Sequence, residues 1–157
     1  MWLERESLVF HGVRFVGCTL WTDFDALSND KAMTGEVTLG EQLKAREKAF
    51  RAANFYLRKH HSLRAGEPML AADWREEGLK SQTWLRQALN TPFDGPTVAI
   101  THFAPSLSSA DPRYGLVPGT AGFCNTLDDL LKQADTALYA AKRDGKNTYR
   151  EADASGV

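Results

Sequence analysis

A histidine that directly follows a strand-like run is the strongest candidate for chemistry in this sequence. Residues 97–101 read Thr-Val-Ala-Ile-Thr, which is β-branched and apolar on both faces, and His102 comes next. This composition is typical of a strand buried in a covered sheet, and ligands collect beyond the carboxyl ends of such strands. A neutral imidazole is a common ligand of transition metals. For a lone histidine the favoured expectation is a hydrogen bond to the loop backbone, and metal binding by His102 is the alternative.

Other side chains that could supply nitrogen or oxygen ligands are His11, His60, His61, Asp23 and Asp25. His60 and His61 are adjacent near an expected helix end, where a favourable interaction with the helix dipole accounts for them without a metal. Asp23 and Asp25 flank Phe24 in a segment without periodicity, so turn capping and solvation are expected there rather than metal binding. None of these residues by itself indicates a metal centre.

The two cysteines do not indicate catalysis. Cys18 lies in an apolar run and is expected to fill the core, while no base that would activate Cys124 is identifiable in the sequence. The cysteines form no Cys-x-x-Cys pair, and the first residues lack the basic region and apolar stretch of a signal peptide. The sequence therefore predicts a cytoplasmic protein with free thiols.

Composition argues against two classes of partner. The chain has 157 residues, of which 43% are hydrophobic and 25% charged, as in an ordinary globular domain. Its net charge of −1 and the lack of a basic run make a nucleic-acid partner unexpected. No segment approaches the roughly 20 apolar residues of a membrane-spanning helix. We expect a single core and neither nucleic acid nor membrane as partner.

The first half of the chain predicts a hairpin, a long loop and a helix. Residues 6–10 and 13–20 are β-rich and are joined by His11 and Gly12, which resembles a hairpin turn. Residues 21–38 mix Asp, Ser, Asn and Gly with little periodicity and are expected to form a long loop. An amphipathic helix follows, with Glu47 and Arg51 four residues apart on its wet side and apolar positions Leu39, Leu43, Phe50, Ala53 and Leu57.

The second half predicts two more helices separated by a strand and a loop. A loop with Gly66 and Pro68 precedes a second helix, marked by Leu70, Trp74, Leu85, Ala88 and Leu89. Asp73 and Glu76 are spaced as a capping box at its start, and Gly78 weakens its middle. The strand at 97–101 and a long ordered loop at 103–125 come next. Residues 126–143 predict a third helix and 147–150 a terminal strand.

Several short motifs together resemble calcineurin-like metallophosphoesterases. They are the segment GVRFVGCTLWTDF at 12–24, THFAPS at 101–106, DPRYG at 111–115 and FCN at 123–125. The resemblance covers about residues 1–131 and corresponds to the second half of such a domain. It implies an α/β fold, a partial sandwich of β-strands flanked by helices, and metal-dependent hydrolysis of a small phosphoester. It also implies that His102 is a ligand of a divalent metal such as Mn, Fe, Zn or Mg.

The rest of that family's metal-binding pattern is missing from this sequence. It contains no Asp-x-His, Gly-Asp-x-x-Asp or Gly-Asn-His, and no Gly-His-x-His follows residue 125. A centre of two metal ions needs several carboxylate and imidazole ligands. The resemblance therefore implies a phosphoesterase with an incomplete and impaired dinuclear site, and no catalytic residue can be assigned.

The C-terminal segment LLKQADTALYAAKRDGKNTY, residues 130–149, resembles the last helix and strand of GGDEF diguanylate cyclase domains. By this resemblance, Lys142 and Lys146 match basic side chains near the triphosphate of GTP. The alternative is that Lys142 interacts with a helix C-terminus and that Lys146 is solvated. The signature Gly-Gly-Asp/Glu-Glu-Phe loop is absent, so cyclase activity is not expected.

The two resemblances meet at LDDLL, residues 127–131. We therefore predict a partial metallophosphoesterase domain at 1–131, a GGDEF-type helix and strand remnant at 132–150, and a disordered tail at 151–157. An incomplete domain is expected to expose sheet edges and to self-associate through them. The alternative functions are a noncatalytic interaction or regulatory fragment and a nucleotide-binding remnant that uses Lys142 and Lys146.

Overall fold

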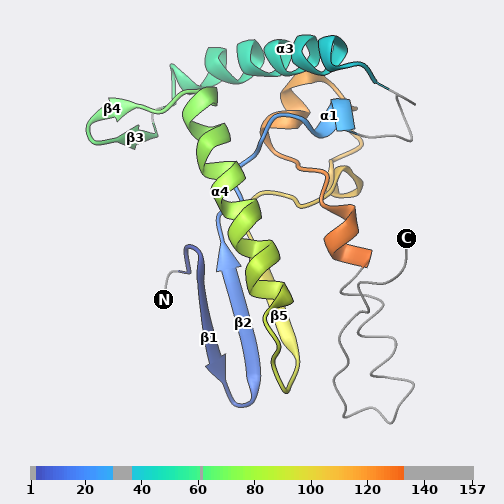
Figure 1. The fold of residues 1–157 in the computed structure, drawn as a ribbon. Helices are drawn as coiled ribbons and strands as arrows, with labels where there is room; N and C mark the ends of the chain where they lie inside the picture. The colour runs from blue at the N-terminus through green and yellow to red at the C-terminus, as the bar shows by residue number, and fades with distance from the viewer. Residues whose placement is uncertain (1–2, 30–36, 61, 133–157) are drawn as a thin grey trace. The chain divides into compact units, whose positions relative to one another are not determined.

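The computed structural model describes residues 3–29, 37–60 and 62–132, and it has a mixed α/β fold (Figure 1). The chain divides into two compact units that are each discontinuous in sequence. Unit 1 draws on residues 1–18, 83–100 and 127 onward, and unit 2 on residues 19–82 and 101–126. The predicted α/β class is confirmed. Within the described residues no helix is long and apolar enough to cross a membrane.

The predicted hairpin is present in unit 1. Strands β1 (Glu6–Phe10) and β2 (Val13–Cys18) pair in antiparallel fashion. His11 and Gly12 form the two-residue turn, with φ of 48° and 75°. A tight hairpin turn of this kind requires positive φ at both central residues, because its twist must match that of the strands.

Strand β5 (Thr97–Thr101) lies beside β2, so the sheet has the order β1-β2-β5. The amide of Arg14 donates to Pro96 O at 2.9 Å, and that of Phe103 donates to Thr19 O at 3.0 Å. From the first bond to the second, the residue number rises along both segments, from 14 to 19 and from 96 to 103. Strand β5 therefore runs parallel to β2. The strand predicted at 97–101 is therefore confirmed.

The predicted burial of that strand on both faces is wrong. Val98 is 42% exposed and Ile100 49% exposed. Among the described residues, β5 is an edge strand and only one face of the sheet is covered. An apolar composition does not report whether a second layer is present.

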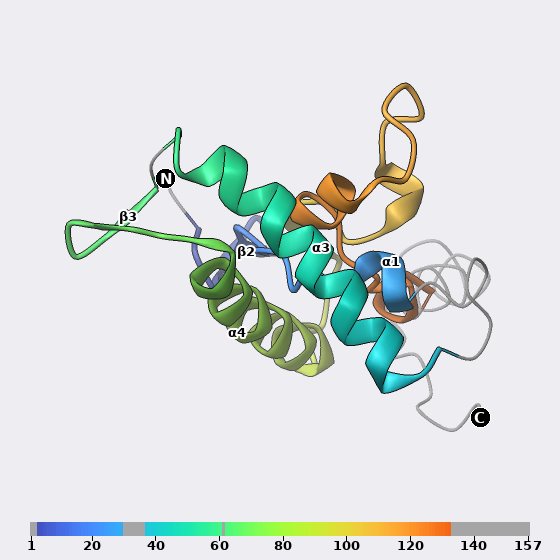
Figure 2. The same ribbon diagram turned by 90° about the horizontal axis from the view of Figure 1, so that it is seen from above.

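The covered face of the sheet carries Arg14, Val16 and Cys18, all of them buried. Arg14 Nε donates to Thr97 Oγ1 at 3.0 Å and Nη1 to Thr91 O at 2.6 Å. Thr91 follows helix α4 (Ala71–Asn90), whose last residues lie along this face in both views (Figures 1 and 2). The guanidinium of Arg14 thus links β2 to β5 and to the residue that follows α4.

Helix α3 (Leu39–Leu57) confirms the first predicted helix. The Thr38 hydroxyl accepts from Glu41 N at 3.3 Å, and the Glu41 carboxylate accepts from Thr38 N at 2.9 Å, which is a capping box. The prediction that Leu39 and Leu43 belong to the packed apolar side of this helix is wrong, since Leu39 is 69% exposed and Leu43 is 49% exposed. The helix is buried instead through its middle and end, at Ala49 and Leu57.

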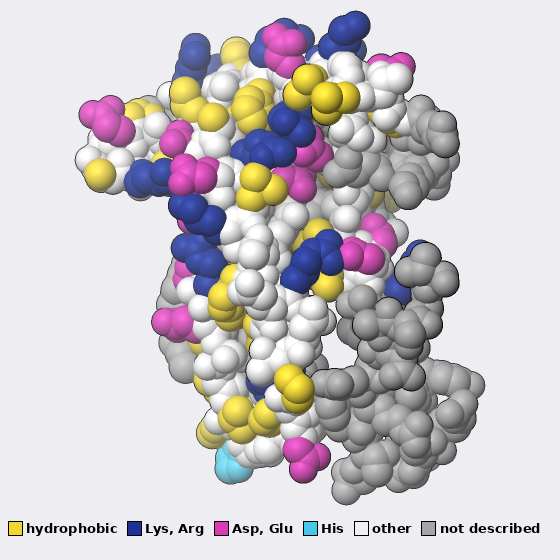
Figure 3. All heavy atoms as spheres, viewed as in Figure 1, with side chains coloured by type: hydrophobic (Ala, Val, Ile, Leu, Met, Phe, Trp, Pro, Cys, Tyr) yellow, Lys and Arg dark blue, Asp and Glu magenta, His cyan; other side chains and the backbone are white. Residues whose placement is uncertain are grey.

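Helix α4 confirms the second predicted helix, but its predicted capping box is wrong. The helix begins at Ala71, and the Asp73 carboxylate reaches back to accept from Leu70 N at 2.9 Å. Glu76 instead accepts from Arg64 at 3.2 Å and from Lys80 at 2.6 Å. Charged side chains of both signs gather over the first half of α4 on the surface (Figure 3).

Gly78 lies inside α4 because the helix touches the backbone of the loop that follows β2 there. A Cβ at this position would lie 2.6 Å from Trp21 O and 2.7 Å from Thr22 O. The glycine that weakens helix propensity in the sequence therefore permits a close approach.

The segment before α4 also forms a small hairpin of β3 (Leu63–Arg64) and β4 (Glu67–Pro68), where only a loop is predicted.

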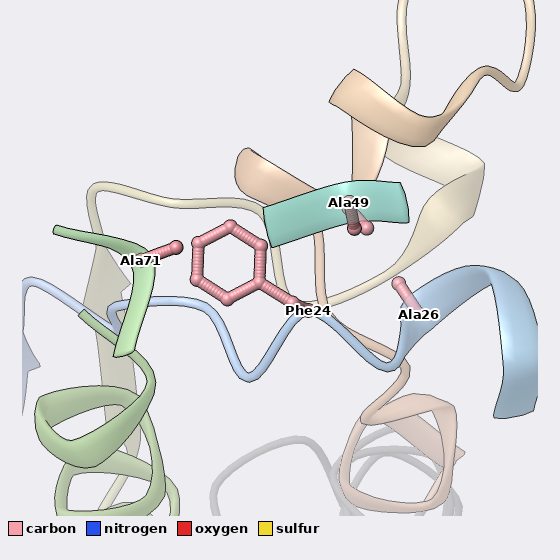
Figure 4. Close-up of a cluster of buried hydrophobic side chains, with 5 residues drawn as sticks. Phe24, Ala26, Ala49 and Ala71 are labelled. Carbon is pink, nitrogen blue, oxygen red and sulfur yellow. The ribbon is translucent and has the colours of Figure 1, made fainter. Parts of the chain in front are cut away.

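A fully buried cluster in unit 2 combines the ring of Phe24 with small side chains, and partly buried side chains that include Phe50 and Trp74 pack against it. Phe24 is surrounded by alanines from three helices and a 3-10 turn, namely Ala26 of α1 (Ala26–Asn29), Ala49, Ala71 and Ala121 (Figure 4). Alanine lets the backbones approach closely around the ring.

The short helix α1 interrupts the loop predicted at 21–38. The predicted ordered loop at 103–125 contains two 3-10 turns, η1 (Leu107–Ser109) and η2 (Pro118–Gly122).

The third predicted helix is described only at its start. Residues 128–132 are helical. The apolar spacing of this helix predicts that Leu127, Leu130 and Leu131 are buried; this is confirmed for Leu127 and Leu130 and wrong for Leu131, which is 46% exposed. The remainder of that helix, the strand predicted at 147–150 and the tail at 151–157 lie outside the described residues. So do Lys142 and Lys146.

Candidate functional site

His102 lies at the carboxyl end of β5, immediately after Thr101, and its side chain is exposed. Its ring meets that of Phe103 edge-on, with 5.1 Å between the ring centroids. Phe103 is buried and packs against Trp21 and Trp74, with centroid distances of 5.8 and 5.5 Å. The predicted position of His102 at a strand end is confirmed, and the adjacent aromatic cluster anchors the backbone that presents it.

Asn125 connects the loop after β2 with the segment after His102. The Asn125 backbone amide donates to Ala104 O at 2.9 Å. Its side-chain amide lies 3.4 Å from both Leu20 O and Ala104 O, and the residue is fully buried. A buried carboxamide that bridges two loops fixes their separation, because leaving any of its polar atoms unpaired would be costly.

Asp23 is held in the same network. Its backbone amide donates to Asn125 Oδ1 at 3.3 Å, and its carboxylate accepts from Asp25 N at 2.8 Å and from Gln82 Nε2 at 2.9 Å. Gln82 Nε2 also lies 3.0 Å from Asn125 Oδ1. The bond to the amide two residues later is the predicted turn capping, which is confirmed. The predicted solvation is wrong, because Asp23 is only 7% exposed.

Asp25 is an ion-pair centre between two helices. Arg46 of α3 binds its carboxylate with two bonds, Nε to Oδ1 at 2.6 Å and Nη2 to Oδ2 at 2.8 Å. Arg75 of α4 adds a bond from Nη2 to Oδ2 at 2.9 Å. Asp25 is 8% exposed, so its predicted solvation is also wrong. The carboxylate instead compensates two cationic side chains that would otherwise be partly buried without an anion.

The loop that carries both aspartates has an unusual backbone. Leu20 and Phe24 adopt positive φ values of 51° and 64°, which are unfavourable for bulky side chains. Both residues are also buried, at 0% and 1% exposure. Such conformations persist where surrounding contacts over-determine them. The bonds of Asp23, Asp25 and Asn125 supply that constraint.

This arrangement does not fit a dinuclear metal centre. The oxygen atoms of Asp23 and Asp25 already accept hydrogen bonds, and two guanidinium groups next to Asp25 would repel a cation. Across the described ranges, no group of three or more His, Cys, Asp and Glu side chains is arranged to hold a metal ion. His102 therefore belongs to no such group among the described residues.

The other described histidines have structural neighbours. The ring of His11, at the β1–β2 turn, meets Phe10 edge-on at 4.1 Å. His60 stacks on Tyr56 at 4.3 Å, and its amide donates to Tyr56 O at 3.1 Å just beyond α3, so the predicted helix-end position is confirmed. His61 lies outside the described residues.

Neither cysteine has the surroundings of a nucleophile. Cys18 ends β2 and is 3% exposed, as expected for core filling. Cys124 is also 3% exposed, and desolvation by burial raises the pKa of its thiol. A raised pKa keeps the thiol protonated, whereas a nucleophilic cysteine needs a lowered one.

Arg46, Arg75 and Gln82 are site residues that the sequence does not reveal, whereas Asn125 lies in the FCN segment at 123–125 but has no role assigned to it there. One signal was available for Arg46, which precedes Phe50 by one helical turn and so shares the face that packs on the core. A charged residue on such a face requires a buried partner. Nothing local identifies that partner as Asp25, which lies 21 residues earlier.

Comparison of the chain with protein-family models, with curated proteins and with solved structures gave no match. Function is therefore inferred from the sequence motifs and from the geometry of the described residues.

Proposed function

We propose that this chain is an incomplete calcineurin-like metallophosphoesterase module with a GGDEF-type C-terminal helix. In this proposal its sheet derives from the partial sandwich of that family, and His102 is a remaining metal ligand. The supporting observation is that His102 is exposed directly after β5, which runs parallel to β2. One imidazole does not hold a metal pair, so we expect little or no phosphoester hydrolysis unless other residues supply ligands.

Metal content and hydrolysis test this proposal together. We expect substoichiometric Mn, Fe, Zn or Mg by elemental analysis, and no hydrolysis of an aryl phosphate above background with added Mn²⁺. In NMR spectra, Mn²⁺ should broaden the ring signals of His102 more than those of His11, a matched exposed histidine.

The informative variants are His102→Ala and His11→Ala. Two tightly bound metal ions and a rate abolished by His102→Ala but not by His11→Ala would show a complete centre and refute the incomplete site. Equal broadening of both histidines by Mn²⁺ would remove the metal-ligand role of His102.

A noncatalytic interaction or regulatory fragment is the second candidate. The observation in its favour is the Asp25 ion-pair network, in which one carboxylate fixes its loop to α3 and α4 rather than binding a ligand. In this case, His102→Ala changes neither Mn²⁺ binding nor melting temperature. A nucleotide-binding remnant at Lys142 and Lys146 stays a prediction, to be abandoned if GTP and cyclic dinucleotides leave the melting temperature unchanged.

A further inference from the structure

Arg14 is a buried cation without an anionic partner in the part of the chain that the structure describes. It is 7% exposed, and among the described residues it is the only Lys or Arg that is buried. Its side chain donates to two neutral oxygen atoms and forms no ion pair with a described carboxylate. Arg46 and Arg75 are less buried, yet both bind Asp25. Because a buried charge without a counter-charge is costly, Arg14 requires compensation from another source.

The guanidinium of Arg14 is held in place by its neighbours in unit 1. Nε donates to Thr97 Oγ1 at 3.0 Å, and Nη1 donates to Thr91 O at 2.6 Å. The centre of the Phe93 ring lies 5.2 Å from Cζ. An aromatic ring offsets part of the cost of a buried cation, but it leaves the N–H groups at the guanidinium edge without acceptors. The side chain is therefore positioned for a ligand that supplies acceptors and negative charge.

Two donor groups of this cluster are unused. Nη2 of Arg14 donates to no described group, and neither does the hydroxyl proton of Thr97, whose oxygen accepts from Nε. In the described ranges, the fully buried side-chain nitrogens that lack a bond are Trp74 Nε1 and Arg75 Nε, and Arg14 Nη2 is not one of them. Nη2 is therefore in contact with solvent, from which an anion reaches it.

We propose that Arg14 and Thr97 bind a small oxyanion, a phosphate or a carboxylate, in unit 1. Nη2 and the Thr97 hydroxyl donate to its oxygen atoms, and its negative charge compensates the buried guanidinium. A guanidinium suits such ligands because its planar N–H groups match the spacing of their oxygen atoms. Thr97 begins β5, whereas His102 follows the end of that strand, so the proposal does not depend on a metal ion at His102.

Titration of the full chain with sodium phosphate and, separately, with sodium acetate tests the site. Sodium chloride keeps the ionic strength constant, so that general screening of charges does not change. The readout is the NMR signal of the Arg14 Nε–H, whose exchange with water is slowed by its bond to Thr97. We expect a saturable shift with a dissociation constant on the order of 1 mM, since one charge and two donor groups bind the anion. The anion with the lower dissociation constant identifies the class of oxyanion that the site takes.

Two variants and a control locate the anion. Thr97→Val removes the hydroxyl at nearly constant size and should raise the dissociation constant about threefold or more. Arg14→Met should abolish saturable binding, followed in this variant by the backbone amide signals of residues 14 and 97. The control is Arg51→Met, because Arg51 is 65% exposed and pairs with Glu47. It should leave the dissociation constant unchanged.

The absence of a saturable shift with both anions up to about 50 mM overturns the proposal, because a site of the expected affinity is then nearly full. An equal shift in sodium chloride alone also overturns it, since the effect is then general screening. Binding that survives Arg14→Met places the anion elsewhere and has the same consequence. If Arg14→Met does not fold, Thr97→Val decides, and an unchanged dissociation constant in that variant rejects the site.

Discussion

Replacing Asp25 with alanine is expected to destabilise unit 2 by about 3 kcal/mol. Removal of one partner from a buried ion pair costs about 3–5 kcal/mol, because the remaining charge is left without compensation. Here the carboxylate side chain is 11% exposed, while Arg46 and Arg75 are 24% and 23% exposed. Water can therefore reach both guanidinium groups in part, which moves the expected cost to about 2–4 kcal/mol.

Urea unfolding followed by tryptophan fluorescence measures this effect, since Trp21 and Trp74 lie in unit 2. With a urea m-value of about 2 kcal/mol/M, a loss of 3 kcal/mol lowers the midpoint by about 1.5 M. Glu47→Ala is the matched control, because its ion pair with Arg51 is similarly short at 2.9 Å but 65–67% exposed. It should cost less than about 1 kcal/mol.

Similar losses of midpoint in Asp25→Ala and Glu47→Ala would refute the buried ion pair as the cause. A double-mutant cycle with Arg46→Met separates the pair from general packing damage, because only the pair contributes to the coupling energy. We expect a coupling of about 1–3 kcal/mol. A coupling near zero would mean that Asp25 stabilises the unit by some other contact.

Two further predictions concern helix positions. Gly78→Ala should destabilise the fold by about 1–3 kcal/mol, because the new Cβ would overlap two backbone carbonyl oxygens at 2.6 and 2.7 Å; Gly40→Ala, where the nearest atom is 4.0 Å away, should be neutral or stabilising in the same urea titration. Thr38→Ala should cost about 1 kcal/mol at pH 7. Hydrogen bonds from the Thr38 side chain and backbone lower the pKa of Glu41 in the folded state. The stabilisation is therefore fully present at pH values above the pKa of Glu41 in the unfolded chain. It is lost as the pH falls through the lower pKa of Glu41 in the folded chain. The difference between wild type and Thr38→Ala should therefore shrink in acid, and a difference independent of pH would contradict the assignment.

Local sequence patterns predicted most of the regular elements. The β1–β2 hairpin follows from two β-rich runs and a turn that tolerates positive φ at His11 and Gly12. Helices α3 and α4 follow from apolar spacing, because the required information lies within a few turns of chain. Burial was predicted less well, and the exposed Val98 and Leu39 illustrate why. Whether an apolar residue is covered depends on a layer that comes from elsewhere in the sequence.

The polar network of unit 2 could not be predicted from local patterns. Asp23 and Asp25 look like loop residues, and their roles depend on side chains from α3, α4 and the segment at Asn125. The short helix α1 was missed for a related reason. Four residues carry too little periodicity to be distinguished from a loop, so tertiary contacts decide their conformation.

The bridge made by Asn125 has a consequence for folding during synthesis. Its bonds join residues that are 102 to 105 positions apart, to Asp23 and Leu20. Contacts of such high sequence separation form late, because a long loop must close before they contribute. The ribosome must therefore release residue 125 before the loop that presents the acidic side chains can settle. Until then the positive φ of Leu20 and Phe24 lacks the support of these bonds. Incompletely folded chains expose apolar surface and are prone to aggregation.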